Sequence, residues 1–183
     1  MAQKGFYYNS TICTGCKTCL IACKDKNDSP VGVNYRKVYT FEGGKFPNVW
    51  AYSLSMSCHH CEKPKCAENC PTGAIYKRKE DGLVLHDKEK CIGCRMCVWS
   101  CPYEAPQYNE EEGKAGKCDG CADLVDKGQN PACVDACLMR AIEFGDIEEL
   151  RAKYGDHVNL KVLADAKMTK PSITVHAIPE AKI

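Results

Sequence analysis

Sixteen cysteines constrain this chain more than any other feature of its sequence. They make up 16 of its 183 residues, several times the share in an ordinary soluble domain. They are clustered rather than scattered, in four runs of four: Cys13, Cys16, Cys19 and Cys23; Cys58, Cys61, Cys66 and Cys70; Cys91, Cys94, Cys97 and Cys101; Cys118, Cys121, Cys133 and Cys137. Any fold of this chain must therefore gather thiols at four places.

The spacing within the runs favours iron–sulfur clusters. The first and third runs read C-x2-C-x2-C-x3-C, the second C-x2-C-x4-C-x3-C and the fourth C-x2-C-x11-C-x3-C, and Pro71 and Pro102 follow the second and third. The first of these spacings, followed by proline, is the bacterial ferredoxin signature. Disulfides need an oxidising compartment, and structural zinc sites favour two cysteine pairs across a longer gap. Only the fourth run, taken alone, fits a zinc ribbon equally well, so we predict four [4Fe–4S] clusters.

The last cysteine of each run predicts how the clusters are shared. It lies four residues beyond the third cysteine, about 6 Å further along if that stretch is helical. It therefore points away from the first cluster and reaches one held by another run. Repeat matching pairs the first run with the fourth and the second with the third, although each run could also close on itself. The expected ligand sets are Cys13, Cys16, Cys19 with Cys137; Cys118, Cys121, Cys133 with Cys23; Cys58, Cys61, Cys66 with Cys101; and Cys91, Cys94, Cys97 with Cys70.

The segments around the cysteines predict an α+β fold of two bacterial-ferredoxin-like modules with a pseudo-two-fold relation. Short strand-like segments precede the first and third runs and follow the second and fourth. Gly15 and Gly93 stand where the backbone must turn tightly, and Asp81-Gly82 predicts a hairpin. We expect module A at 1–30 and 109–145, an insertion at 31–49, module B at 50–108, and a C-terminal helix and tail at 146–183.

The cysteine-free segments carry weaker signals. Residues 24–57 predict a strand-bearing insertion whose aromatic side chains pack in a core or face a partner, with a turn at Gly43-Gly44. Residues 110–116 are charged and predict a surface connection. Asp146 is expected to cap a helix over 147–154 that ends at Gly155. We expect the chain from Val158 onward to be irregular and to wrap around a partner, with a free tail as the alternative.

Composition and the remaining motifs exclude several functions. A net charge of +1 argues against a nucleic-acid binder, and no apolar run reaches the roughly 20 residues of a membrane span. Met1–Lys4 does not resemble the start of a signal peptide, and no nucleotide-binding or nucleophile motif occurs. We therefore expect no catalytic residue. His59 and His60 are interpreted as polar neighbours of the second run, and Lys17 and Arg95 as cations in cluster loops that raise cluster potentials or are simply solvated.

Several stretches resemble the four-cluster iron–sulfur subunits of molybdopterin oxidoreductases, and above all those of the dimethyl sulfoxide reductase family. They are Cys13–Cys19, Ile21–Asp25, Cys91–Arg95, Pro102–Asn109, Lys117–Cys121 and Thr169–Pro171. Leu138 departs from the family pattern, which commonly has proline after the last cysteine.

The resemblance implies a non-catalytic subunit that passes electrons between a large molybdopterin-containing subunit and a membrane anchor subunit that oxidises quinol. It places the cluster of Cys13, Cys16 and Cys19 nearest the molybdenum and the cluster of Cys91, Cys94 and Cys97 nearest the membrane. The protein is then peripheral in a membrane-associated complex, on a face that the sequence leaves undecided. A diffusible polyferredoxin is the alternative.

Overall fold

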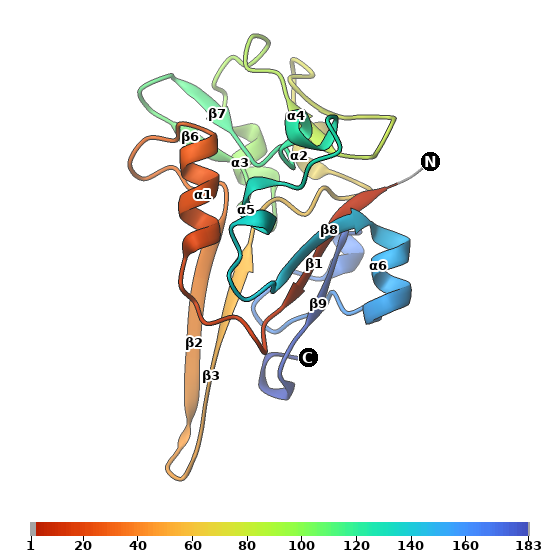
Figure 1. Cartoon of the computed structure of the whole chain (residues 1–183). Coiled ribbons are helices and arrows are strands. Elements are labelled where there is room, and N and C mark those ends of the chain that lie inside the picture. Colours follow the sequence, from red (N-terminus) through yellow and green to blue (C-terminus); the bar gives the residue numbers. More distant parts are fainter. Residues whose placement is uncertain (1–2, 183) are drawn as a thin grey trace.

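The computed structural model describes residues 3–182. Met1, Ala2 and Ile183 lie outside the described residues. The first residues of predicted module A, the last residue of the predicted tail and half of the Met1–Lys4 segment therefore lie outside them as well. Helices are interspersed among small, mainly antiparallel sheets, so the α+β class is confirmed (Figure 1). The strands are β1 Lys4–Asn9, β2 Lys37–Lys45, β3 Asn48–Met56, β4 Ile75–Lys77, β5 Val84–His86, β6 Gln107–Asn109, β7 Lys114–Gly116, β8 Ile142–Asp146 and β9 Ile173–His176. The helices are α1 Thr18–Lys26, α2 Lys65–Glu68, α3 Met96–Ser100, α4 Ala122–Val125, α5 Ala132–Asp135 and α6 Ile147–Tyr154, with 3₁₀ turns at Ala166–Met168 and Pro179–Ala181.

A three-stranded sheet of order β8-β1-β9 forms the main core. β1 pairs antiparallel with β8 and parallel with β9, which places Phe6 opposite both Phe144 and Ile173. The Phe6 and Phe144 rings lie 4.8 Å apart. Helix α6 packs beside this sheet (Figure 1), and its Ile147 and Leu150 side chains are buried. The buried apolar side chains stabilise the sheet that leads into the first cysteine run.

The predicted boundaries of α6 are confirmed. The Asp146 carboxylate accepts hydrogen bonds from the backbone N–H groups of Glu148 and Glu149, at 2.9 and 3.4 Å. Gly155 follows the helix with a φ of 86°, a left-handed conformation that glycine adopts without a steric penalty. The cap and the stop were both readable because each depends on a local residue preference.

The expectation of an irregular C-terminal segment is wrong for β9. Ile173, Thr174 and Val175 are buried in the main sheet beside β1. Two of these three residues are β-branched aliphatics and the third is threonine, which suits a buried strand. The segment from 158 to 182 therefore packs against its own chain, and its contact with a partner stays a prediction.

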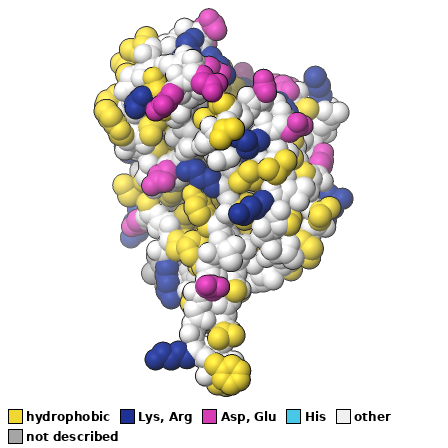
Figure 2. Space-filling view, turned by 90° about the vertical axis from the view of Figure 1, so that its left-hand side faces the viewer, with side chains coloured by type: hydrophobic (Ala, Val, Ile, Leu, Met, Phe, Trp, Pro, Cys, Tyr) yellow, Lys and Arg dark blue, Asp and Glu magenta, His cyan; other side chains and the backbone are white. Residues whose placement is uncertain are grey.

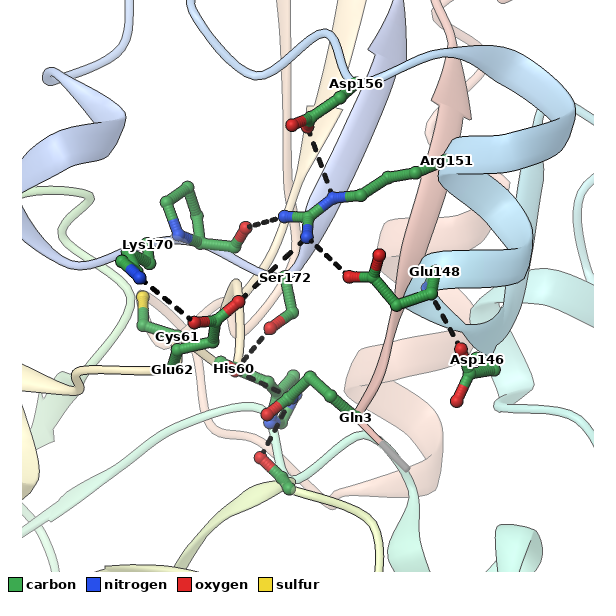
Figure 3. A network of polar contacts seen from close by, with 12 residues as sticks. Gln3, His60, Cys61, Glu62, Asp146, Glu148, Arg151, Asp156, Lys170 and Ser172 are labelled. Carbon is green, nitrogen blue, oxygen red and sulfur yellow. Dashed lines mark hydrogen bonds and ion pairs between the residues drawn. The ribbon is translucent and has the colours of Figure 1, made fainter. Parts of the chain in front are cut away.

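Polar contacts join this C-terminal segment to the second cysteine run (Figure 3). The Arg151 guanidinium donates to the Pro171 carbonyl at 3.1 Å and forms ion pairs with Glu148 and Asp156 at 3.0 and 3.2 Å. The backbone N–H of Glu62 donates to the Lys170 carbonyl at 2.8 Å. The C-terminal segment thus fixes the loop that carries the second run.

The insertion contains a long hairpin of β2 and β3 that projects from the body (Figures 1 and 2). The predicted turn at Gly43-Gly44 is wrong, because Lys45 pairs with Asn48 and the chain reverses at Phe46 and Pro47. Gly43 instead lies in β2 opposite Trp50, where a Cβ atom would lie 2.5 Å from the Trp50 ring, so the position has no room for a side chain. β3 continues to Met56, so the hairpin crosses the predicted boundary between 49 and 50.

Two shorter hairpins flank the cysteine runs. β4 and β5 pair as the Asp81-Gly82 turn predicts, with Gly82 at a φ of 70°. β6 and β7 form a second hairpin, so residues 110–116 are only partly a surface connection. Ala115 and Gly116 of β7 are buried, and the Tyr35 phenol packs against Gly116.

Helix packing brings the cysteine runs together in pairs. α1 packs against α5, and α2 packs against α3. An ion pair of 2.9 Å between Lys26 and Asp123 adds a second contact between the segments of the first and fourth runs. The first run therefore lies beside the fourth and the second beside the third. The division into two modules with the boundaries given above stays a prediction.

Candidate metal centre

The first group of thiols surrounds a small cavity beside β1 and α1. Its lining includes Cys13, Cys16, Cys19 and Cys137. The loop after β1 supplies the first two, the first turn of α1 the third, and the segment after α5 the last. Three cysteines of the first run thus lie with the last cysteine of the fourth.

Hydrogen bonds aim at the sulfur atoms of this first group. The Gly15 N–H donates to Cys13 Sγ at 3.4 Å, and the Ala141 N–H donates to Cys137 Sγ at 3.2 Å. The Gly15 φ of 69° is needed for this turn, and a Cβ there would lie 2.5 Å from Ser53 Oγ. N–H groups aimed at thiolate sulfur are among the features that set the potential of an iron–sulfur cluster.

Two further cavities are lined by four cysteines each. One contains Cys58, Cys61, Cys66 and Cys101, and the other contains Cys70, Cys91, Cys94 and Cys97. In each, three cysteines of one run lie with the last cysteine of the other. Gly93 makes the turn between Cys91 and Cys94 with a φ of 70°.

The remaining four thiols lie close enough to influence each other's ionisation. Burial raises the pKa of Cys23, and Cys118, Cys133 and Cys121 raise it further. The Gly120 N–H donates to Cys118 Sγ at 3.4 Å. All sixteen cysteines therefore lie in four groups of four, and we refer to them as site I (Cys13, Cys16, Cys19, Cys137), site II (Cys118, Cys121, Cys133, Cys23), site III (Cys58, Cys61, Cys66, Cys101) and site IV (Cys91, Cys94, Cys97, Cys70).

The four sites follow one another. Sites I and II share the packed helices α1 and α5, and sites III and IV share α2 and α3. Sites II and III are neighbours through Cys118 and Cys58, which belong to one buried cluster. Burial raises the pKa of Cys118, and the nearby Cys58 raises it further. The order is I, II, III, IV. Ligation of iron at these sites stays a prediction that this arrangement motivates.

The chemistry of the donors fits iron–sulfur clusters. Burial raises the pKa values of Cys61, Cys66 and Cys121 to about 12, so these thiols alone stay protonated at neutral pH. A bound metal removes such protons outright, and soft thiolate sets select zinc, copper(I) or iron–sulfur clusters. Within residues 3–182, no three His, Cys, Asp or Glu side chains converge as they would on a single ion. The thiols of sites I, III and IV instead line cavities, as they would around a cluster of several atoms.

The histidines of the second run occupy buried positions beside these sites. His60 Nδ1 accepts a hydrogen bond from the Val84 N–H at 3.0 Å, and its Nε2 lies 3.8 Å from Cys118 Sγ. His59 borders the cavity of site III, and neither of its ring nitrogens has a hydrogen-bond partner among residues 3–182. Burial lowers the pKa of His59 to about 3, so the ring is neutral and keeps one N–H to donate. This buried, unpartnered donor suits a site that holds a sulfide acceptor.

The cations buried near the cysteine sites are not the ones that the sequence predicted. Lys17 and Arg95 lie in the cysteine loops as predicted, but both are exposed, and Arg95 stacks on the Tyr108 ring at 3.7 Å. Among residues 3–182 the buried lysine and arginine side chains are those of Lys117 and Arg36, and neither was predicted from the sequence to be functional. Lys117 directly precedes Cys118, so its place in the sequence could have predicted a role near a cluster. No cysteine lies close to Arg36 in the sequence, so no local pattern predicts such a role for it.

Comparisons with known proteins identify the family of this chain. A family model described as a 4Fe-4S dicluster domain covers residues 49–147. An anaerobic dimethyl sulfoxide reductase chain of Escherichia coli (strain K12) is 50% identical over 181 residues, which span 94% of this protein and 88% of that one. This protein belongs to the 4Fe-4S dicluster family and is a relative of the reductase chain. The predicted resemblance is confirmed.

Other relatives in the family serve different oxidoreductases. A sulfite dehydrogenase subunit of Allochromatium vinosum is 38% identical, over 81% of this chain and 71% of its own length. A thiosulfate reductase electron transfer subunit of Salmonella typhi is 41% identical, over 75% and 72%. This protein is accordingly an iron–sulfur electron-transfer subunit of an oxidoreductase and not the catalytic one.

Proposed function

We propose that this chain passes single electrons through four [4Fe–4S] clusters, one at each of sites I to IV, between a large molybdopterin-containing catalytic subunit and a membrane anchor subunit. The grouping of all sixteen thiols into four neighbouring quartets is the observation that carries the proposal. Bound clusters supply the one-electron chemistry. The chain's own residues hold them in sequence and bury the thiols of site II most deeply.

The two ends of the series differ from its middle in exposure. Site I contains the exposed Cys16 and site IV the exposed Cys94, whereas all four thiols of site II are buried. Exposed apolar side chains stand beside both ends, with Leu138 next to site I and Trp99 next to site IV. Exposed ends bordered by apolar surface suit docking to two different partners.

The direction of the series follows the family resemblance. We propose that site I faces the catalytic subunit and site IV the membrane subunit. No helix among residues 3–182 has the length and apolar character to span a bilayer. The proposal makes the chain a peripheral member of a membrane-associated complex.

Anaerobic purification of the tagged chain from its own host tests this function. We expect a brown complex with about sixteen irons per chain, from the [4Fe–4S] stoichiometry, and a co-eluting large subunit that contains molybdenum or tungsten. A brown chain that elutes alone near its own 20.3 kDa supports the diffusible carrier instead. A colourless, zinc-loaded chain refutes both.

Surface variants separate the two docking ends. We expect Leu138→Asp to release the large subunit and Trp99→Asp to release the chain from membranes, each with the full iron content. Val31→Asp, at a fully exposed valine, serves as the matched control and is expected to change neither. Equal loss of both partners in both variants contradicts the assignment of ends.

A further inference from the structure

Two cations are buried in the interior without a carboxylate partner. Arg36 is 2% exposed and Lys117 is 5% exposed. Within the described residues neither has a carboxylate oxygen within 4.0 Å, although the molecule contains several surface ion pairs. Burying an unpaired charge is costly, so such cations need negative charge nearby. Cysteines of sites I, II and III lie near the two cations, and as cluster-bound thiolates they would supply that charge.

Arg36 lies between sites I and II. Its guanidinium donates to Ser55 Oγ at 3.0 Å and to Ser57 Oγ at 2.9 Å. Ser55 Oγ in turn lies 3.3 Å from Cys19 Sγ of site I. The Arg36 charge also opposes the burial that raises the pKa values of Cys23 and Cys133, which belong to site II. One fixed charge therefore reaches two neighbouring sites.

Lys117 lies between sites II and III. Its ammonium donates to the carbonyls of Val84 and Cys118, the latter at 2.6 Å, and it borders the cavity of site III. Its charge interacts with the thiols of Cys118 in site II and of Cys58 and Cys66 in site III. The second junction of the series thus has a buried cation of its own.

Site IV has a different electrostatic environment. The cation that borders its cavity is Arg95, which is exposed and stacked on Tyr108. Solvent and salt screen an exposed charge, whereas a buried charge acts through a low dielectric. Each one-electron reduction adds a negative charge to a site, so a buried cation favours the reduced form and raises the potential.

We propose that Arg36 and Lys117 are charge-tuning residues, which hold the potentials of sites I and II and of sites II and III, respectively, above the values those sites would otherwise have. Site II is then raised by both cations and site IV by neither. The inference rests on the proposed function, because it needs a cluster at each site. Two residues outside the cysteine runs would then help to set the differences in potential between neighbouring clusters.

Redox titration of the full chain, loaded with iron and purified without oxygen, tests the proposal, with electron paramagnetic resonance as the readout. Arg36→Met is expected to shift the midpoint potentials of sites I and II downward. Lys117→Met is expected to shift those of sites II and III downward, so one cluster shifts in both variants and one in neither. At the original midpoint of a shifted cluster, the ratio of reduced to oxidised form is expected to fall about tenfold, which is 59 mV for one electron.

The controls separate charge from packing. Arg36→Lys and Lys117→Arg keep the charge. At the wild-type midpoint potential of each cluster, we expect their ratio of reduced to oxidised form to lie within about twofold of the wild-type ratio. Lys167→Met removes an exposed cation and is expected to leave all four potentials unchanged. Arg36→Gln and Lys117→Gln are neutral alternatives in case a methionine variant fails to load iron.

Three outcomes overturn the proposal. The first is a neutral variant with full iron content and unchanged potentials. The second is an equal shift of all four potentials. The third is loss of iron in both neutral variants of a residue, which makes that residue purely structural. A wild-type protein that takes up no iron gives no signals at all and refutes the proposed function instead, so the two failures are distinguishable.

Discussion

The C-terminal strand is the structural feature least expected from the sequence, and Val175→Ala tests it. Val175 is 1% exposed in β9, beside β1 of the main sheet. The change removes two buried carbon atoms, each contributing about 0.8 kcal/mol on transfer from water. With a small addition for the cavity left behind, we expect the free energy of unfolding to fall by about 2 kcal/mol. For a chain of this length, that lowers the melting temperature by about 4 to 8 °C.

Thermal denaturation under anaerobic conditions measures this effect, with loss of the brown absorbance and of circular dichroism followed together. Because loss of iron makes unfolding irreversible, all variants are compared at one scan rate. Val31→Ala is the matched control, since the same atoms are removed from a fully exposed side chain, and we expect a change within about 0.5 kcal/mol. Equal melting temperatures for the two variants would refute the placement of β9 in the core.

Three further predictions test other parts of the molecule. Gly93→Ala, where the new Cβ would collide with the Gly113 carbonyl oxygen, is expected to lose the iron of site IV by metal analysis. Gly73→Ala has a similar positive φ but open space around it, and we expect only about 1 kcal/mol of destabilisation in the same melting assay. Burial tends to raise the pKa of Asp81, but the Arg78 guanidinium at 2.9 Å outweighs it and lowers that pKa below the unfolded value of about 3.9. The stability that this pair adds is therefore present above about pH 4 and lost as the pH falls through the lowered pKa, and Asp81→Asn is expected to remove that part of the pH dependence in acid titrations of melting temperature. Finally, removal of iron by a chelator is expected to unfold the chain, as seen by circular dichroism, and a native spectrum after complete removal would contradict this.

Local rules explain most of what the sequence predicted. The Asp146 cap, the Gly155 stop, the Asp81-Gly82 hairpin and the tight turns at Gly15 and Gly93 each depend on a residue's own conformational preference. The cysteine spacing acts in the same local way, because three thiols at steps of three residues must share one loop. Such features can be read from a few neighbouring residues.

Long-range packing explains what the sequence did not predict. β9 is a four-residue strand whose partner β1 is more than 160 residues away, so no local pattern distinguishes it from an irregular tail. Gly43-Gly44 looked like a turn, yet Gly43 is there because the Trp50 ring lies across it. Arg36 stands among ordinary residues of the insertion, and only folding brings it to Cys19 and Cys133. Each of these depends on which distant surface arrives next to the residue.

An iron anomalous-difference map from crystals grown without oxygen tests the central claim most directly. We predict four separate groups of iron atoms, one at each of sites I to IV. We expect Cys137 against the iron bound by Cys13, Cys16 and Cys19, and Cys23 against the iron bound by Cys118, Cys121 and Cys133. Iron bound with Cys23 and Cys137 each closing its own run, or an anomalous signal at the zinc edge in place of iron, would contradict it.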